Sequence, residues 1–175
     1  MSVMLDAGHG GKDSGAIGNG SRESDLNLLW VSLIDFELGQ RGHFVHWTRF
    51  DDTDVTLQER VNQCNGLEDV ECFVSVHCNS NDGPPARGFE VFHHPSAPQR
   101  SRDLAEEIVA EWPHPHVRGV KAANYKVLRD TKVPAVLIEL GFINHPTEGK
   151  NLDKLSWALP AAEAIAEAIH EWLRG

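Results

Sequence analysis

Cysteine is scarce in this sequence, with Cys64, Cys72 and Cys78 as the three examples among 175 residues. An odd number without a CxxC pair excludes a complete disulfide framework and does not supply a cysteine-based structural zinc site. Cys72 and Cys78 lie on one expected strand, where a rise of about 3.3 Å per residue separates them by roughly 20 Å, too far for a disulfide. We therefore expect free thiols.

Positive charge is also in short supply, because 16 lysines and arginines stand against 26 aspartates and glutamates, for a net charge of -10. Affinity for nucleic acid depends mainly on clustered lysines and arginines, so the composition argues against a nucleic-acid partner. No apolar run approaches the roughly 18 to 20 residues that span a bilayer, and the amino terminus lacks the basic-then-apolar pattern of a secretory signal. These absences predict a soluble protein that is made in the cytoplasm and does not insert into a membrane.

Apolar sequence is plentiful enough to build a core, at 41% of the residues. No repeat, low-complexity tract or linker divides the chain, so we expect one domain over residues 1–175. Short apolar runs alternate with amphipathic segments, a pattern that yields a sheet covered by helices on both faces. The predicted fold class is α/β.

The expected elements follow from this alternation. Glycines within residues 8–11 end the first strand, and apolar residues recur at helical spacing after Glu23 until Gly39, which is expected to stop that helix. The proline-containing segment 111–119 is expected to be a rigid, exposed connector. Strands are expected over residues 3–5, 44–48, 72–77, 88–93, 125–128 and 135–140, and helices over 23–38, after a cap at Thr56, over 101–112 and at the carboxyl end.

Four polar residues fall beside the same edge of this expected sheet. His9 follows the first strand, Glu23 begins the next helix, and His77 and Glu139 end two later strands. In open α/β sheets, ligands bind beyond the carboxyl ends of the strands, where neighbouring loops converge. We therefore expect these four side chains to meet.

The four residue types are those of a catalytic zinc site. Such a site commonly takes two imidazoles and a carboxylate from the protein and leaves a position for water or substrate, which His9, Glu23 and His77 fit. Glu139 lies in an apolar run, where a carboxylate is costly unless it is paired or kept for function, and it is the natural general base for the zinc-activated water.

Each of these residues alone also has a structural interpretation. His9 also fits a turn residue, His77 a hydrogen-bonded residue at a strand end, and Glu23 an acid placed favourably near a helix amino terminus. Asp6, three residues before His9, either orients the ring of His9 or forms a turn. Their predicted convergence favours the metal site.

An ordered set of motifs runs along nearly the whole chain. The motifs are the run from Leu5 to Gly18 with its DAGHGGKDSGAIG core, Glu23, Thr48-Arg49 with Asp51, Leu57 with Arg60, FVSVHCN at residues 73–79, GFEV at 88–91 and PAVLIELGF at 134–142. Together they resemble the catalytic domain of zinc-dependent N-acetylmuramoyl-L-alanine amidases of the type 3 family, and the ordered set is far more specific than its glycine loop alone.

The resemblance implies a central, mostly parallel six-stranded sheet flanked by helices. It implies one zinc ion held by His9, Glu23 and His77, with Glu139 as the catalytic base. It also suggests that Asn79 and Arg129 bind substrate, although Asn79 also fits a turn cap and Arg129 a solvated cation beside Asp130. A monomer is expected.

The function implied by the resemblance is hydrolysis of the amide between N-acetylmuramic acid and L-alanine in peptidoglycan. A zinc peptidase acting on the stem peptide is an alternative, because the same ligands serve several amide cleavages. A cell-wall binding module without catalysis is another, and the apolar surroundings of Glu139 speak against it. The expected place of action is the bacterial cell wall, reached either as a phage-like lysin or as a domain excised from an exported protein.

Overall fold

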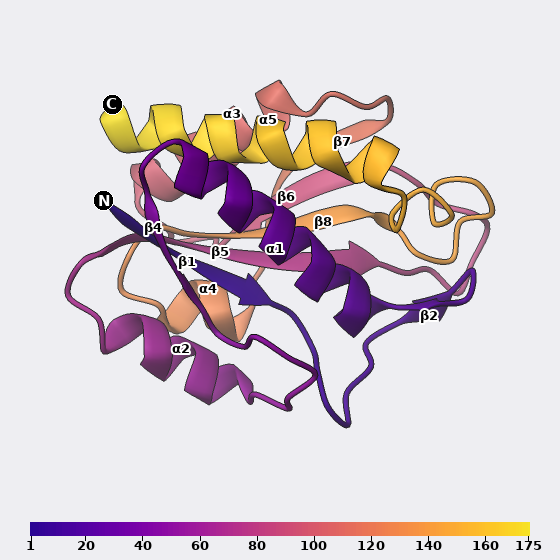
Figure 1. The fold of residues 1–175 in the computed structure, drawn as a ribbon, viewed down its shortest axis with the longest axis horizontal. Helices are drawn as coiled ribbons and strands as arrows, with labels where there is room; N and C mark the ends of the chain where they lie inside the picture. The colour runs from indigo at the N-terminus through magenta and orange to yellow at the C-terminus, as the bar shows by residue number, and fades with distance from the viewer.

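The computed structural model describes residues 1–175 as a central sheet with helices packed on both of its faces (Figure 1). The central strands are β1 (Ser2–Ala7), β4 (Phe44–Trp47), β5 (Val70–Asn79), β6 (Phe89–His93), β7 (Val117–Ala122) and β8 (Ala135–Phe142). A separate two-stranded ribbon consists of β2 (Ile17–Gly18) and β3 (Ser21–Arg22). The helices are α1 (Glu23–Gln40), α2 (Leu57–Asn65), α3 (Gln99–Glu111), α4 (Lys126–Asp130) and α5 (Leu155–Arg174).

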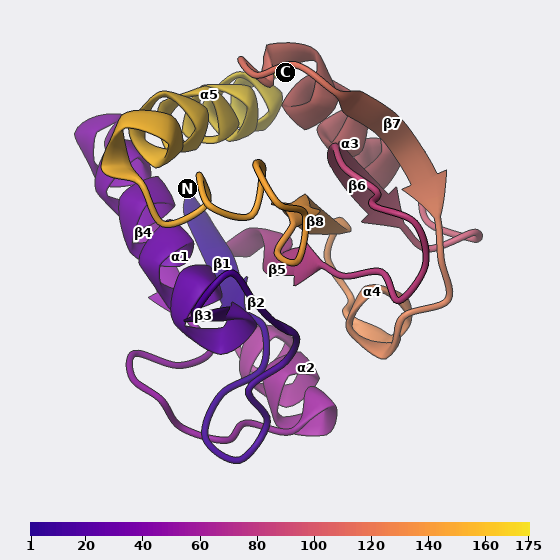
Figure 2. The ribbon, with the colours of Figure 1, turned by 90° about the vertical axis from the view of Figure 1, so that its right-hand side faces the viewer.

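The six-stranded sheet has the order β4-β1-β5-β8-β6-β7 and is mostly parallel. Strand β1 pairs in parallel with β4 and β5, and β5 with β8. Strand β6 runs antiparallel to β8, and β7 runs parallel to β6. The carboxyl ends of β1, β5 and β8 therefore meet at one edge, which faces the viewer in Figure 2, together with the amino ends of β6 and β7.

Alternation along the strands divides the interior into two cores. Val74 and Val76 of β5 pack into the larger core with α1, α3 and α5, whereas Phe73 packs into the smaller one with α2 and α4. This is the arrangement expected of strands buried on both faces, where successive side chains point to opposite sides. None of the helices is both long and apolar enough to cross a membrane.

Helix α2 shows how local sequence fixes an element next to the site. The Thr56 side chain accepts a hydrogen bond from the backbone N–H of Glu59, and the Glu59 carboxylate accepts one from the backbone N–H of Thr56. This reciprocal capping box satisfies two amide groups that lack a partner within the helix. The expected cap at Thr56 is thus confirmed.

The predicted α/β class and the mostly parallel six-stranded sheet are confirmed, but the structure differs from the expected elements in three places. Residues 125–128, expected as a strand, are instead the cap and first part of the short helix α4, which buries Val127 and Leu128 in the smaller core. The connector expected at 111–119 gives way at Val117 to strand β7, an edge strand that is largely exposed and has no apolar run to mark it. Helix α1 also passes Gly39, and the turn comes at Gly42, whose φ of 79° suits glycine.

Candidate metal centre and its cleft

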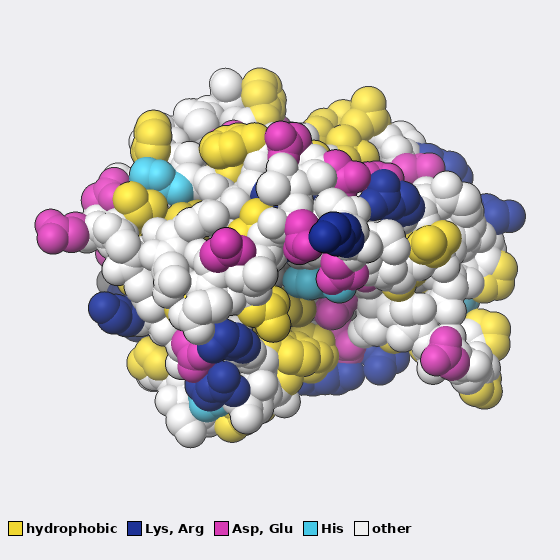
Figure 3. Space-filling model, turned by 90° about the horizontal axis from the view of Figure 1, so that it is seen from below, with side chains coloured by type: hydrophobic (Ala, Val, Ile, Leu, Met, Phe, Trp, Pro, Cys, Tyr) yellow, Lys and Arg dark blue, Asp and Glu magenta, His cyan; other side chains and the backbone are white.

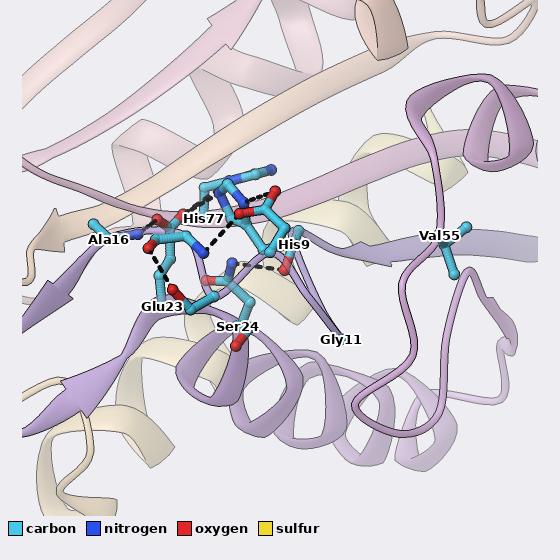
Figure 4. Close-up of polar contacts among 12 residues, drawn as sticks. His9, Gly11, Ala16, Glu23, Ser24, Val55 and His77 are labelled. Carbon is cyan, nitrogen blue, oxygen red and sulfur yellow. Dashed lines mark hydrogen bonds and ion pairs between the residues drawn. The ribbon is translucent and has the colours of Figure 1, made fainter.

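The four predicted site residues meet at the carboxyl edge of the sheet. His9 lies in the loop after β1, Glu23 is the first residue of α1, His77 is near the end of β5, and Glu139 is near the end of β8. His77 and Glu139 are paired in the parallel register of β5 and β8. Figure 4 shows His9, Glu23 and His77 directed toward one another, with Val55 well apart from them.

The two histidines converge on a single carboxylate oxygen. His9 Nε2 lies 3.1 Å from Glu23 Oε1, and His77 Nδ1 lies 2.9 Å from the same oxygen. The rings stand edge to face with their centroids 4.9 Å apart. One ligand atom from each of the three residues lies within 4.8 Å of the other two. Nitrogen and carboxylate donors in such a group suit a zinc ion, so the donor set fits the metal that the resemblance implies.

Neighbouring groups hold each donor in place. His9 Nδ1 is 2.8 Å from Asp13 Oδ2, so the other ring nitrogen, Nε2, faces Glu23. The backbone N–H of Cys78 donates to Glu23 Oε1, and that of Ala16 donates to Glu23 Oε2. Asp13 thus supports His9 in the way that carboxylates commonly orient metal-binding histidines. The sequence signal for this role is the position of Asp13, four residues after His9 in the glycine loop.

Glycine is required where the loop passes close to these side chains. A Cβ atom added at Gly8 would lie 2.1 Å from His77 Cε1, and one added at Gly15 would lie 2.6 Å from Glu23 Oε2. His9 itself has φ of 61°, a left-handed conformation that non-glycine residues seldom adopt. Strained backbone of this kind persists where the surrounding structure enforces it, and it concentrates at functional sites.

Two buried arginines fix the backbone beneath the loop. Arg60 donates to the carbonyl oxygens of Ala7 and His9, and Arg49 donates to those of Ala7 and Gly8. The partner acid of Arg60 is Asp6, at 2.6 Å. Both guanidinium groups are buried. Charged hydrogen bonds, rather than apolar packing, therefore hold the loop that follows β1 in place.

Asp6 does not contact His9, so the idea that it orients that ring is wrong. Its oxygens accept hydrogen bonds from Thr48, Ser75 and Arg60. Burial alone would raise the pKa of Asp6, but the positive charge of Arg60 and these hydrogen bonds hold it below its usual value. Asp6 is therefore an ionised, buried anchor for Arg60.

The pKa values of His9 and Glu23 are shifted in opposite directions. Burial alone would lower the pKa of His9, but hydrogen bonds and negative charge from Glu23 and Asp13 raise it to about 9. Burial alone would raise the pKa of Glu23, but His77 and His9 bring it far below its ordinary range. A positive charge is thus favoured among these donors, and in the metal-free protein a proton on His9 supplies it.

Glu139 has the opposite character. Burial, reinforced by the negative charges of Glu23 and Glu90 and opposed by His77, raises its pKa to about 7. Its Oε2 atom is buried and has no hydrogen-bond partner. A carboxyl group in this state readily exchanges a proton near neutral pH, as a general acid or base must.

A cleft of about 440 Å³ opens at the cluster, on the face of the sheet that carries α2 and α4. Figure 3 shows this face, with histidine side chains in a central hollow beside acidic and hydrophobic ones. The lining residues include the site residues His9, His77 and Glu139 as well as Asp13, Val55, Leu57, Arg60, Tyr125, Lys126 and Leu137. Such a mixture of apolar walls with a few polar groups is typical of ligand sites.

The two predicted substrate-binding residues lie outside the lining of this cleft. The Asn79 amide donates from Nδ2 to Glu90 Oε1 at 2.7 Å, and its Oδ1 accepts from the backbone N–H of Ser80. Arg129 is exposed on α4, where it donates to Asp130 and to Asn124. Their contact with substrate stays a prediction.

The sequence matches the N-acetylmuramoyl-L-alanine amidase family over residues 3–171. The N-acetylmuramoyl-L-alanine amidase LytC of Bacillus subtilis (strain 168) is 33% identical over 177 residues, which cover 99% of this chain and 36% of LytC. The endolysin of Bacillus phage SPP1 is 38% identical over 180 residues, which cover 98% of this chain and 65% of the endolysin. The chain therefore spans only part of the length of these relatives.

A solved structure supports the same grouping. The catalytic domain of CwlV, an N-acetylmuramoyl-L-alanine amidase from Bacillus (Paenibacillus) polymyxa var. colistinus, superposes with a TM-score of 0.91 at 33% identity. The match covers 99% of this chain and 98% of that domain. The likeness thus extends over almost the whole chain, including the elements that carry His9, Glu23, His77 and Glu139.

Proposed function

Because this chain belongs to the N-acetylmuramoyl-L-alanine amidase family, as its resemblance predicted, we propose that it hydrolyses the amide between N-acetylmuramic acid and L-alanine with the help of one zinc ion. The observation that carries this proposal is the convergence of His9 Nε2 and His77 Nδ1 on Glu23 Oε1, next to the buried carboxyl group of Glu139. Residues 1–175 act in this proposal as a zinc amidase catalytic domain, and its substrate is peptidoglycan.

His9, Glu23 and His77 are the residues that would hold the zinc ion. A zinc ion there would supply Lewis-acid chemistry, by polarising the amide carbonyl and making a water molecule more acidic. The protein orients these donors through neighbouring groups. Asp13 determines which nitrogen of His9 faces the site, and two backbone N–H groups orient the Glu23 carboxylate. Preorganised donors of this kind avoid the cost of reorganisation on binding.

Glu139 moves the proton. Its buried, unpartnered oxygen is available to accept a proton from the attacking water, and a pKa of about 7 lets it return that proton to the leaving amine of L-alanine. A carboxylate with the ordinary low pKa of glutamate would be a weaker base and would accept the proton from water poorly. Glu139 lies opposite His77 on the neighbouring strand and is not among the three residues whose donor atoms converge, so this proposal assigns it to proton transfer rather than to metal binding.

Asn79 and Arg129 are retained as substrate-binding residues in this proposal. Asn79 acts beside Glu90, to which it donates, and Arg129 from the exposed end of α4. The domain is proposed to act as a monomer at the bacterial cell wall, as a phage-like lysin or as part of an exported protein. The relatives named as an endolysin and as an amidase support this setting.

The experiment that tests the proposal is digestion of purified sacculi, with the released fragments identified by mass spectrometry. We expect new amino termini at L-alanine and intact lactyl groups on the glycan. Release of free D-amino acids instead would assign the site to a stem-peptide peptidase. Binding to sacculi without any release would identify a wall-binding module. Glu139→Gln protein is the matched control for contaminating hydrolases.

A further inference from the structure

A buried acid next to the site gathers two cations that the proposed reaction does not use. Glu90 on β6 is buried, and its Oε2 accepts a hydrogen bond from Arg118 Nε at 2.6 Å and another from Lys121 Nζ. Its other oxygen, Oε1, accepts from Asn79. Both cations come from β7, the edge strand that has little apolar sequence of its own.

The cluster carries more positive charge than the single acid neutralises. One carboxylate faces two cations, in a chain whose formal net charge is -10. The side chains of Arg118 and Lys121 are 37% and 36% exposed, so both reach solvent while Glu90 anchors them from inside. Arg118 uses only Nε for Glu90, which leaves both terminal N–H₂ groups of its guanidinium free. Guanidinium groups bind carboxylates through two such donors at once.

The position of the cluster relates it directly to the reaction. Glu90 is paired with Glu139 in the antiparallel register of β6 and β8, and β7 is the next strand beyond β6. Strands lie about 4.8 Å apart, so the cations of β7 lie roughly 10 Å across the sheet from Glu139. An extended peptide advances about 3.3 to 3.6 Å per residue, so two residues beyond the cleaved bond span about 7 Å. The charged ends of Arg118 and Lys121 reach back to Glu90 on β6 and therefore lie closer to Glu139 than the backbone of β7 does. The basic residues that line the cleft itself are Arg60 and Lys126, so Arg118 and Lys121 lie outside its lining.

From this arrangement we infer that Arg118 and Lys121 form a subsite for a carboxylate of the stem peptide, two residues beyond the bond that is cut. The inference rests on the proposed amidase function and adds the direction of the peptide, which leads from β8 over β6 to β7. The bound group is the free α-carboxylate of a γ-linked glutamate at the second stem position. Its neutral carboxamide form loses the charge that both cations recognise.

The test compares two soluble synthetic muramoyl peptides that differ only in that group, one with the α-carboxylate and one with the α-carboxamide. For the zinc-loaded wild-type protein we expect kcat/KM to be roughly tenfold higher for the carboxylate, which corresponds to about 1.4 kcal/mol. Arg118→Gln and Lys121→Gln should each reduce this preference, mainly by lowering the rate on the carboxylate substrate. Arg118→Lys keeps the charge and should keep most of the preference.

Lys132→Gln is the matched control, because Lys132 is exposed and precedes β8 at its other end. It removes one positive charge and should leave the preference unchanged. The Tm of each variant, measured by thermal unfolding, checks that the fold stays stable when buried Glu90 has lost one of its two cationic partners. If Arg118→Gln unfolds, Arg118→Lys and Lys121→Gln still decide the question.

Two results would overturn the inference. Wild-type protein that cleaves both soluble substrates equally well has no such subsite, although its amidase function stands. Variants that lose activity only on whole walls rich in phosphate polymers, and not on the soluble carboxylate substrate, would assign the cations to wall phosphate. Failure of wild-type protein to release L-alanine termini from either substrate would instead refute the proposed function itself.

Discussion

His77 and Glu139 are direct neighbours across β5 and β8, yet they have opposite surroundings. The His77 ring nitrogen Nδ1 is 2.9 Å from Glu23 Oε1, whereas Glu139 Oε2 is buried without any partner. One parallel register therefore places a metal donor and a group that exchanges protons at adjacent positions on the same face. This pairing separates two roles that can be tested one at a time.

Replacing Glu139 with glutamine should abolish hydrolysis and spare metal binding. The amide has nearly the shape of the carboxyl group but cannot accept a proton, so we expect a loss of about 100-fold to 10,000-fold in kcat. Zinc content, measured by atomic spectroscopy after dialysis, should stay near one ion per chain. Loss of zinc together with activity would make Glu139 a ligand rather than a base.

Replacing Asp13 with asparagine should weaken zinc binding without unfolding the protein. The 2.8 Å contact to His9 Nδ1 would lose its charge, and changes of this kind typically reduce metal affinity by about 10-fold to 100-fold. Competition with a chromogenic chelator measures the affinity. Asp153→Asn, at an exposed position after β8, is the control and should bind zinc as the wild type does. Equal affinities of both variants would remove Asp13 from the support of His9.

Replacing Gly8 with alanine should damage the site because the new Cβ would overlap the His77 ring, 2.1 Å from Cε1. We expect loss of zinc retention and a destabilisation of about 1 to 3 kcal/mol, the usual cost of overpacking. Gly39→Ala is the matched control, since its Cβ would meet nothing within 4 Å inside α1. That variant should gain about 0.5 to 1 kcal/mol, and urea unfolding measures both changes. A Gly8→Ala protein with normal zinc content would contradict the close approach.

The stability of the zinc-free protein should depend on pH through His9 and Glu23. The pKa of His9 is raised from 6.5 to about 9, so its contribution is complete below pH 6.5 and is lost as pH rises toward 9. The pKa of Glu23 is lowered from 4.5, so its contribution is complete above pH 4.5 and is lost as pH falls below it. Thermal unfolding should thus show a decline in Tm between pH 6.5 and 9. His9→Ala protein should lack this decline, and a wild-type Tm that rose over the interval would contradict the sign.

Much of this site was predictable from the sequence because the hydrophobic pattern placed strand ends and a helix start next to the polar residues, and parallel strands end at the same side of a sheet. His9, Glu23, His77 and Glu139 each stand where an expected strand ends or a helix begins, and the fold brings them together. The family resemblance, confirmed by the match over residues 3–171, supplied the chemistry. Their roles in metal binding and proton transfer remain predictions for the variants above.

The parts that were missed depend on contacts between distant segments. Strand β7 is stabilised by its pairing with β6 and has no apolar run of its own, so the local sequence pattern does not predict it. Residues 125–128 contain apolar residues that suit a strand, but burial of Val127 and Leu128 in the smaller core selects a helical turn. The ion pairs of Glu90 with Arg118 and Lys121 could not be predicted either, because both cations lie on β7, the strand that the hydrophobic pattern does not predict.

The most direct test is a crystal structure of the zinc-loaded protein with anomalous data collected on both sides of the zinc absorption edge. We expect one strong anomalous peak bonded to His9, Glu23 and His77, with the Glu139 carboxyl group near the metal but not bonded to it. A peak held by other residues, or zinc-loaded crystals in which these three side chains bind no metal, would contradict it.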